Sequence, residues 1–214
     1  MKNIAAAVAG ATGLVGGLVL RRLLDDPEVA RVIAPTRRPL PPHPKLSNPI
    51  FDGAAWPALP PRDEAYGCLG TTRRAAGSDE AFRAVDLELT RSFARAAKAA
   101  GAKRFGLVSS IGADARSRFL YLKTKGEAEA AASGLGFESV AIVRPFYLVG
   151  ERAEARPAEA FAIKAFQILA PVLQGPLRRW RPVQAGDVAA ALIAALRGRV
   201  PGTLVLESDA IRAP

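Results

Sequence analysis

The glycine-rich start of the chain places the strongest constraint on its fold. The run IAAAVAGATGLVGGLVL, residues 4–20, is small or apolar throughout and lies between a lysine and two arginines. A membrane helix needs about 20 mostly apolar residues, and this run is shorter and contains four glycines. A secretory signal peptide has a similar apolar stretch but gains nothing from glycines three positions apart. The pattern instead predicts a buried strand at 4–9 that turns sharply into a helix at 14–24.

The loop GATGLVG between this strand and helix has the spacing GxxGxxG, with glycines at 10, 13 and 16. Such glycines let the backbone approach a pyrophosphate without a Cβ in the way, and the last one lets helix and strand pack closely. The helix N-terminus then offers free amides to anionic oxygens. An ordinary glycine turn is the alternative, but the strand–turn–helix context favours dinucleotide binding.

Strands and helices are predicted to alternate along the rest of the chain. Apolar runs and helical spacing predict strands at 31–34, near 50–51, and at 64–69, 104–109, 139–144 and 203–206, with helices at 78–100, 121–133, 157–169 and 187–196. Alternation at these intervals predicts a mostly parallel, doubly wound sheet in a three-layer α/β/α fold. The 214 residues suffice for one domain, 1–214, with a small substrate-side region formed by about 145–185.

The net charge of +10, from 30 basic and 20 acidic residues, raises the question of a nucleic-acid partner. The basic residues are scattered without one long run. The compact cluster Arg178, Arg179 and Arg181 around Trp180 fits a solvated edge, or an acidic substrate or partner. We therefore expect no nucleic-acid partner and no membrane association. The single cysteine, Cys68, cannot form an internal disulfide, so the expected location is the cytoplasm.

The end of the second strand indicates which dinucleotide is bound. An NAD site usually has an aspartate or glutamate there for the ribose hydroxyls, whereas this chain has APTRRP, with Thr36, Arg37 and Arg38. Charge-assisted hydrogen bonds to a 2′-phosphate contribute about 1.5 to 3 kcal/mol. The sequence therefore favours NADP(H) over NAD(H) as cofactor. The alternative is a pair of loop arginines that only face water.

Three polar groups are predicted to converge at the carboxyl edge of the sheet. YLKTK places Tyr121 and Lys125 four residues apart on one helix face, and Ser109 and Ser110 end the strand before that helix. The spacing of Tyr121 and Lys125 alone is weak evidence for a catalytic site, because solvated charge on a helix also explains it. Together the groups fit hydride transfer: Lys125 and a positive nicotinamide ring favour the phenolate of Tyr121, which exchanges a proton with a substrate oxygen. Ser110 would hydrogen-bond that oxygen.

The motifs GATGLVG, SSIGAD, YLKTK and VRPFYLVG, in this order, resemble the short-chain dehydrogenase/reductase superfamily in its extended or atypical branch. CLGTTRRAAG and SSIGADARSRFLYLKTKGEAEA are more narrowly similar to the Tat-interactive-protein group of small oxidoreductases. The resemblance covers about residues 4–206. It implies an NADPH-binding Rossmann domain with Ser110, Tyr121 and Lys125 as catalytic residues. The sequence itself does not indicate the oligomeric state, although a homodimer is common in families of this type.

Cofactor contacts are expected from the glycine loop, from the ends of the strands and from the catalytic helix. The expected residues are Gly10, Thr12, Gly13, Leu14, Val15, Gly16, Thr36, Arg37, Arg38, Asp52, Leu69, Gly70, Thr71, Ser109, Tyr121, Lys125, Arg144, Pro145 and Phe146. A single histidine, His43, makes a metal site improbable. Asp187 is expected to be a helix N-cap.

The chain departs from the extended members in three ways. Asp86 stands where they commonly have an asparagine in the fourth helix, so the usual proton-relay water does not carry over. The choice between Ser109 and Ser110 depends on a one-residue shift of the alignment. The long C-terminal substrate lobe is missing, so specificity is expected from residues 146–166 and the Trp180 region.

The sequence motifs are compatible with three functions. The leading one is an NADP(H)-dependent oxidoreductase that acts on a small carbonyl or alcohol substrate. The second is a non-catalytic NADP(H)-sensing protein that regulates a partner and needs the glycine loop but not the Ser-Tyr-Lys site. The third and weakest is a nucleic-acid binder, whose association would depend steeply on salt.

Overall fold

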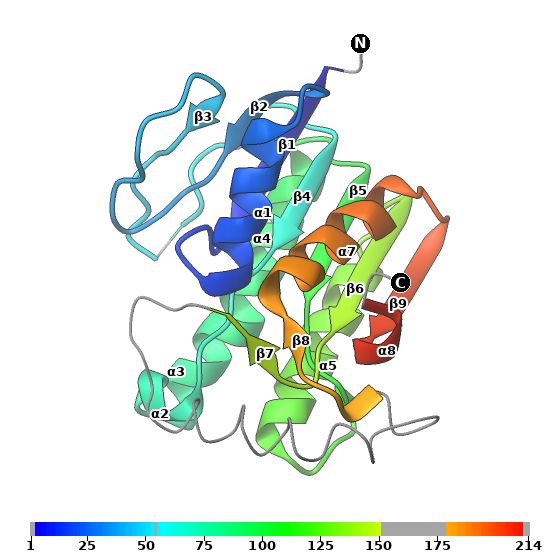
Figure 1. Cartoon of the computed structure of the whole chain (residues 1–214). Helices are drawn as coiled ribbons and strands as arrows, with labels where there is room; N and C mark the ends of the chain where they lie inside the picture. Colours follow the sequence, from blue (N-terminus) through cyan, green and yellow to red (C-terminus); the bar gives the residue numbers. More distant parts are fainter. Residues whose placement is uncertain (1–2, 54, 151–178, 212–214) are drawn as a thin grey trace.

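The structure is a computed structural model that describes residues 3–53, 55–150 and 179–211. Its centre is a seven-stranded sheet with the order β3-β2-β1-β4-β5-β6-β9, and every neighbouring pair is parallel (Figure 1). The strands are β1 (Ile4–Ala9), β2 (Val29–Ile33), β3 (Leu46–Ser47), β4 (Glu64–Gly67), β5 (Arg104–Val108), β6 (Ser139–Arg144) and β9 (Gly202–Glu207). This confirms the predicted doubly wound, mostly parallel sheet. A separate short pair, β7 (Leu148–Val149) and β8 (Val183–Gln184), lies beyond the carboxyl edge.

Helices cover both faces of the sheet, as predicted. Their bounds are α1 (Leu14–Asp25), α2 (Arg73–Ala76), α3 (Asp79–Arg83), a π-helical segment (Ala84–Leu89), α4 (Thr90–Ala99), α5 (Leu120–Ser133), α7 (Ala185–Arg197) and α8 (Ser208–Ile211). Helices α1 and α7 pack on one face, and α4 and α5 lie on the other (Figure 1).

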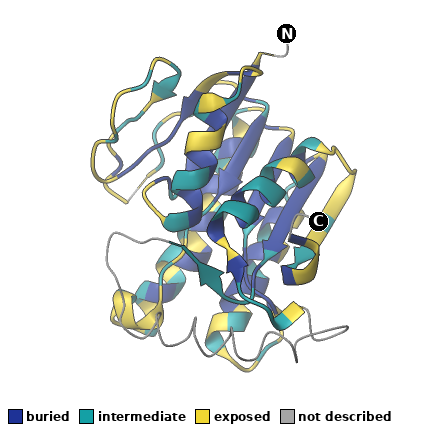
Figure 2. Cartoon of the chain, viewed as in Figure 1, coloured by how far each residue is buried: buried dark blue, intermediate teal, exposed yellow. Residues whose placement is uncertain are grey.

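Two apolar cores separate these layers. On one side, Val19 of α1 and Leu192 of α7 pack with Val8 and Tyr66 of the sheet. On the other side, the core is built around Phe93 of α4 and aromatic and aliphatic side chains of β5 and β6. All six residues of β1 are buried, because small side chains alternate into both cores. Figure 2 shows this buried sheet between helices whose outer faces are exposed.

The third strand lies earlier in the chain than the sequence predicted. It forms at Leu46–Ser47, and Ile50 makes only an isolated bridge with Thr36 and is 60% exposed. Pro49 precedes Ile50 and has no amide hydrogen to donate to a ladder. The predicted strand at 50–51 is therefore wrong in position. The other strands agree with the prediction to within two residues at each end.

The predicted long helix at 78–100 is not regular. The structure divides it into α3, the π-helical segment and α4, which ends at Ala99 just before Gly101, where φ is +86°. Asp187 is not an N-cap: α7 begins at Ala185, with Gln184 as its cap, because β8 leads directly into the helix. The predicted helix at 157–169 lies outside the described residues, and the single-domain organisation stays a prediction.

A charged network ties helices α1 and α7 to the amino end of the sheet. Glu64 at the start of β4 is fully buried and contacts Arg104 at 3.3 Å and Arg197 at 3.2 Å. Tyr66 donates a hydrogen bond of 2.9 Å to the same carboxylate. Arg197 also pairs with Asp26 at the end of α1. The network lies at the edge of the sheet opposite the glycine loop, and its role is to hold the helices on the sheet.

We expect the Asp26→Asn variant to be less stable than wild type by about 0.5 to 1 kcal/mol at pH 7. Burial alone would raise the pKa of Asp26, but hydrogen bonds from Arg197 and the Glu28 amide hold this pKa below its usual value of 3.8. A carboxyl whose pKa is lowered by folding stabilises the folded state above its unfolded pKa. That contribution is lost as the pH falls through the folded pKa. Urea unfolding of both proteins should show the difference at pH 7 and its disappearance in acid. The Asp25→Asn variant, at the neighbouring exposed acid, is the control, and an equal loss there would contradict the prediction.

Candidate functional site

The glycine loop forms a tight turn that only glycine can occupy at two positions. Gly10 has a φ of +81°, and a Cβ on it would lie 2.5 Å from the carbonyl oxygen of Cys68. A Cβ on Gly16 would lie 2.1 Å from the carbonyl oxygen of Gly10. Gly13 donates its amide to that same oxygen at 2.9 Å and serves as N-cap of α1 without a side-chain cap. The first amides of α1 therefore remain available to an anion beside a turn that has no side chains in the way.

An open hollow of about 330 Å³ lies beside this loop and is lined by Thr12, Arg37 and Arg38. Both arginines are exposed. Thr36, also predicted as a cofactor contact, is buried instead: its hydroxyl donates to the Arg38 carbonyl at 2.6 Å and accepts from Asn48 at 2.8 Å. It therefore shapes the arginine loop from inside. Two cations and a hydroxyl fit a phosphate group, which supports the predicted site at the end of β2.

The remaining residues predicted near this loop differ in their exposure. Leu14 is half-buried at the start of α1, and a Cβ on Gly150 would lie 3.0 Å from its side chain. Val15 is buried in the core, so only its backbone can face a ligand. Asp52 is exposed and follows Phe51, whose amide donates to the Thr36 carbonyl at 3.0 Å. Asp52 therefore lies on the same side as the arginine loop.

Lys125 forms a buried ion pair that the sequence did not predict. Its ammonium lies 2.6 Å from Oδ1 of Asp86, and the two side chains are 8% and 0% exposed. The other carboxylate oxygen accepts the amide of Thr71 at 2.8 Å. A Cβ on Gly70 would lie 3.6 Å from the Lys125 ammonium. Asp86 thus joins the CLGTT loop to helix α5.

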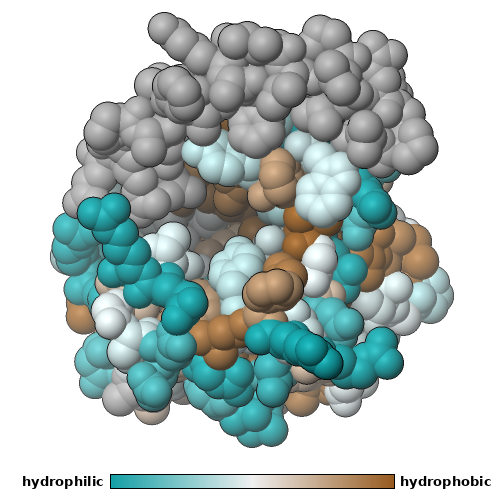
Figure 3. All heavy atoms as spheres, turned by 90° about the horizontal axis from the view of Figure 1, so that it is seen from below, coloured by the Kyte–Doolittle hydropathy of each residue, from teal (hydrophilic) through white to brown (hydrophobic). Residues whose placement is uncertain are grey.

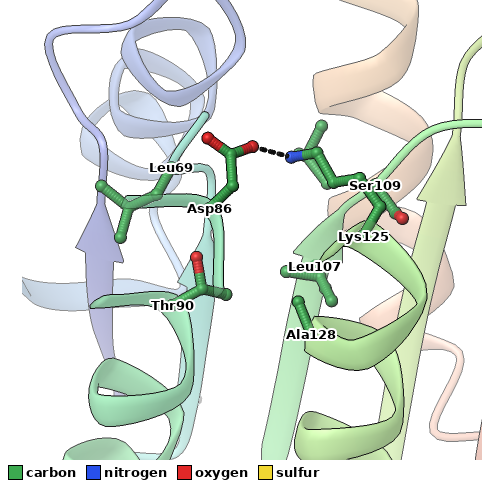
Figure 4. A pocket seen from close by; sticks show the side chains of 8 residues that line it. Leu69, Asp86, Thr90, Leu107, Ser109, Lys125 and Ala128 are labelled. Carbon is green, nitrogen blue, oxygen red and sulfur yellow. Dashed lines mark ion pairs between the residues drawn. The ribbon is translucent and has the colours of Figure 1, made fainter. Parts of the chain in front are cut away.

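A narrow pocket surrounds this ion pair (Figure 4). Leu69 and Thr90 approach from the Asp86 side and Ala128 from the Lys125 side, with Ser109 at the end of β5 completing the wall. The Ser109 hydroxyl is buried and has no hydrogen-bond partner among the described residues. Ser110 is also buried but does not line this pocket. The geometry therefore brings Ser109, rather than Ser110, together with Lys125.

Tyr121 occupies the more open part of the same edge. Its side chain is 37% exposed, and its ring stacks on Phe82 of α3 at 5.8 Å between centroids. Helix α5 is held close to the preceding loop by Gly126, where a Cβ would lie 2.2 Å from the Ala115 nitrogen. Figure 3 views the molecule from this carboxyl edge and shows a hollow with both hydrophilic and hydrophobic residues along the described part of its rim. Tyr121 and Lys125 therefore belong to one face of α5, with the phenol nearer to solvent.

The segment after β6 contributes mostly internal contacts. The Arg144 guanidinium makes two hydrogen bonds to Glu129 of α5, at 2.9 and 2.5 Å, and these raise the pKa of the arginine. The Pro145 carbonyl accepts the Ile111 amide at 3.2 Å. Phe146 donates its amide to Ser208 at 2.7 Å. The guanidinium of Arg144 is thus paired with the Glu129 carboxylate, and its contact with the cofactor stays a prediction.

Residues outside the site have structural explanations. Burial raises the pKa of the Cys68 thiol to about 12, in keeping with an inert strand-end cysteine. Arg179 lies over the Trp180 ring at 5.4 Å, and Trp180 packs edge-on against Phe146. Arg178 lies outside the described residues. Within the described ranges, no three of the side chains His, Cys, Asp and Glu cluster as metal ligands would, and no helix is long and apolar enough to cross a membrane.

Comparison with known proteins supports the fold and the family. The profile of the NAD dependent epimerase/dehydratase family matches residues 6–205. The chain is 40% identical over 173 residues to "Protein fmp52, mitochondrial" of Emericella nidulans, covering 76% of this chain and 73% of that protein. It is 38% identical over 175 residues to the rat protein HTATIP2, covering 78% and 72%. The crystal structure of human epimerase family protein SDR39U1 with NADPH superimposes with a TM-score of 0.66 at 21% identity, covering 95% of this chain and 74% of that one.

These comparisons correct one prediction. The expected cytoplasmic location is contradicted, because relatives such as the Emericella protein are named mitochondrial. A single unpaired cysteine argues only against an oxidising compartment and does not distinguish one reducing compartment from another.

The resemblance to short-chain dehydrogenases/reductases, the Rossmann-type sheet and the nicotinamide dinucleotide cofactor are confirmed together. The glycine turn fits such a cofactor, since Cβ atoms at Gly10 and Gly16 would clash with the backbone that forms the turn. The chain belongs to the NAD dependent epimerase/dehydratase family.

Proposed function

We propose that the protein is an NADP(H)-dependent oxidoreductase that transfers hydride between the nicotinamide and a small carbonyl or alcohol substrate. The observation that carries this proposal is the placement of Tyr121, Lys125 and the Ser109-Ser110 pair along the carboxyl edge that also holds the glycine turn. Ligands of doubly wound sheets bind at this edge. Family membership supports the proposal, because the family is defined by its NAD-dependent reactions.

The residues of the site have distinct roles in this proposal. The glycine turn and the first amides of α1 hold the diphosphate, and Lys125 holds the nicotinamide ribose. The bound cofactor supplies or accepts the hydride. Tyr121 gives its phenolic proton to the substrate oxygen, or takes that proton back in the reverse direction. A serine hydroxyl donates a hydrogen bond to the same oxygen: the sequence resemblance implies Ser110 for this role, whereas the pocket around Lys125 favours Ser109.

We expect the Arg37→Ala variant to bind NADPH about tenfold more weakly than wild type, with little change for NADH. Only NADPH carries the 2′-phosphate, and the loss of a charge-assisted hydrogen bond costs about 1.5 kcal/mol or more. Arg37 is exposed at the hollow beside Thr12, which is where this phosphate would be held. Titration of cofactor fluorescence gives both dissociation constants. The exposed Arg21 on α1 provides the control variant Arg21→Ala, and equal wild-type affinities for NADPH and NADH would refute the preference.

Turnover of NADPH with a panel of aldehydes and ketones tests the oxidoreductase itself. Oxidation of NADPH that requires both the protein and a carbonyl compound is the expected result. Tight NADPH binding without turnover of any member would instead support the non-catalytic sensing function. The narrow pocket around Lys125 is the observation that favours this second function.

A further inference from the structure

The carboxylate of Asp86 is placed by an irregular turn of helix. Residues 84–89 form a π-helical segment between α3 and α4. The Thr90 hydroxyl donates to the Val85 carbonyl, five residues earlier, at 3.4 Å across this widened turn. Single π turns inside helices are frequent at functional sites, because they redirect one side chain without ending the helix. Here the turn directs Asp86 into the pocket, where its side chain is fully buried.

Asp86 makes two contacts that serve different parts of the site. One oxygen lies 2.6 Å from the ammonium of Lys125. The other accepts the amide of Thr71, in the loop that follows β4. An asparagine could accept the same amide hydrogen bond, so that contact alone does not require a carboxylate. The negative charge is needed only for the contact with Lys125.

The residues around Asp86 strengthen the interaction of its charge with Lys125. The six other described residues that line the pocket are all uncharged: Leu69, Thr90, Leu107, Val108, Ser109 and Ala128. Charges interact more strongly in such surroundings than in water. The nearby charges Arg83 of α3 and Glu127 of α5 pair with each other at 2.8 Å. Asp86 is therefore the countercharge that Lys125 meets in the described part of the pocket.

We propose that Asp86 is a positioning residue that fixes the Lys125 ammonium and offsets its charge, so that the protein tolerates the oxidised, positively charged nicotinamide as well as the reduced ring. This inference rests on the proposed function, in which Lys125 faces the nicotinamide ribose. With Asp86 ionised, the pair presents little net charge to the ring. Without the carboxylate, a lone ammonium would repel NADP⁺ but not NADPH.

The ratio of two dissociation constants tests this role directly. In the Asp86→Asn variant, the Kd of NADP⁺ divided by the Kd of NADPH should rise about three- to tenfold relative to wild type. Isothermal titration calorimetry measures both constants without any substrate. A purely structural role would weaken both cofactors by the same factor and leave the ratio unchanged. The control is Glu88→Gln, an exposed acid in the same π-helical segment that pairs with Arg91, and it should leave the ratio at its wild-type value.

A second variant separates the charge effect from misfolding, since removing one member of a buried ion pair destabilises proteins strongly. The double variant Asp86→Asn with Lys125→Met removes both charges and should return the ratio to within about twofold of wild type. Thermal unfolding confirms that each variant is folded. An unchanged ratio in Asp86→Asn, or a ratio in the double variant as high as in Asp86→Asn, overturns the inference. Wild-type protein that binds neither cofactor would overturn the proposed function as well, so the two failures can be told apart.

Discussion

Replacing Tyr121 by phenylalanine is expected to lower kcat by about 10²- to 10⁴-fold, the usual contribution of a positioned proton donor. The ring would keep its stacking on Phe82 at 5.8 Å, because only the hydroxyl is lost. The partly exposed position of the side chain also means that little buried hydrogen bonding is disturbed. NADPH affinity and thermal stability should therefore stay close to those of wild type. Steady-state turnover and cofactor titration on the same preparation measure both quantities.

The matched control for this variant is Lys123→Gln, an exposed residue on the same helix. Its turnover should equal that of wild type within experimental error. If Tyr121→Phe turns over substrate as fast as wild type, Tyr121 has no part in the chemistry. If cofactor affinity falls together with turnover, the phenol contributes to binding and the assignment as proton donor fails.

The Gly16→Ala variant is expected to lose about a hundredfold or more in NADPH affinity and about 1 to 3 kcal/mol in stability. The added methyl group would lie 2.1 Å from the Gly10 carbonyl oxygen and 3.1 Å from Cβ of Cys68. Both the turn and the start of α1 must move apart to accept it. Amides aimed at the diphosphate then lose their alignment, and charge-assisted hydrogen bonds weaken steeply with poor geometry.

Gly186→Ala provides the control for this glycine, because no atom lies within 4 Å of a Cβ there and the position is within α7. Alanine should be neutral or slightly stabilising at that position. Calorimetric titration with NADPH and thermal unfolding of both variants separate binding from folding. Wild-type affinity in Gly16→Ala would show that the loop does not hold the diphosphate.

The strand–turn–helix at the start of the chain was predictable because its determinants are local. Gly10, Gly13 and Gly16 lie within seven residues, and the steric conflicts that require two of them arise within the turn and with β4 next to it. The alternation of strands and helices follows from apolar periodicity in the same way. Tyr121 and Lys125 were found by their spacing on one helix, which is also a local pattern.

The contacts that the sequence did not reveal join residues far apart in the chain. Asp86 and Lys125 are brought together by the packing of two helices, and no pattern around either residue announces the pair. The pairing of Arg144 with Glu129 likewise depends on the packing of helix α5 against strand β6. The π-helical segment was missed because the residues 84–89 have ordinary helix-forming character, and the extra residue becomes visible only through the hydrogen bonds.

The widened turn at residues 84–89 also has a consequence for how chains of this kind can diverge. A π turn takes up one extra residue locally, so deleting one residue from this segment would restore regular winding while the two flanking halves keep the faces that they present. Phe93 of α4 would then keep its place in the core, but the turn that directs Asp86 toward Lys125 would be lost. A one-residue gap at this position in another chain would therefore mark the loss of the acidic partner more reliably than the identity of the residue aligned with Asp86.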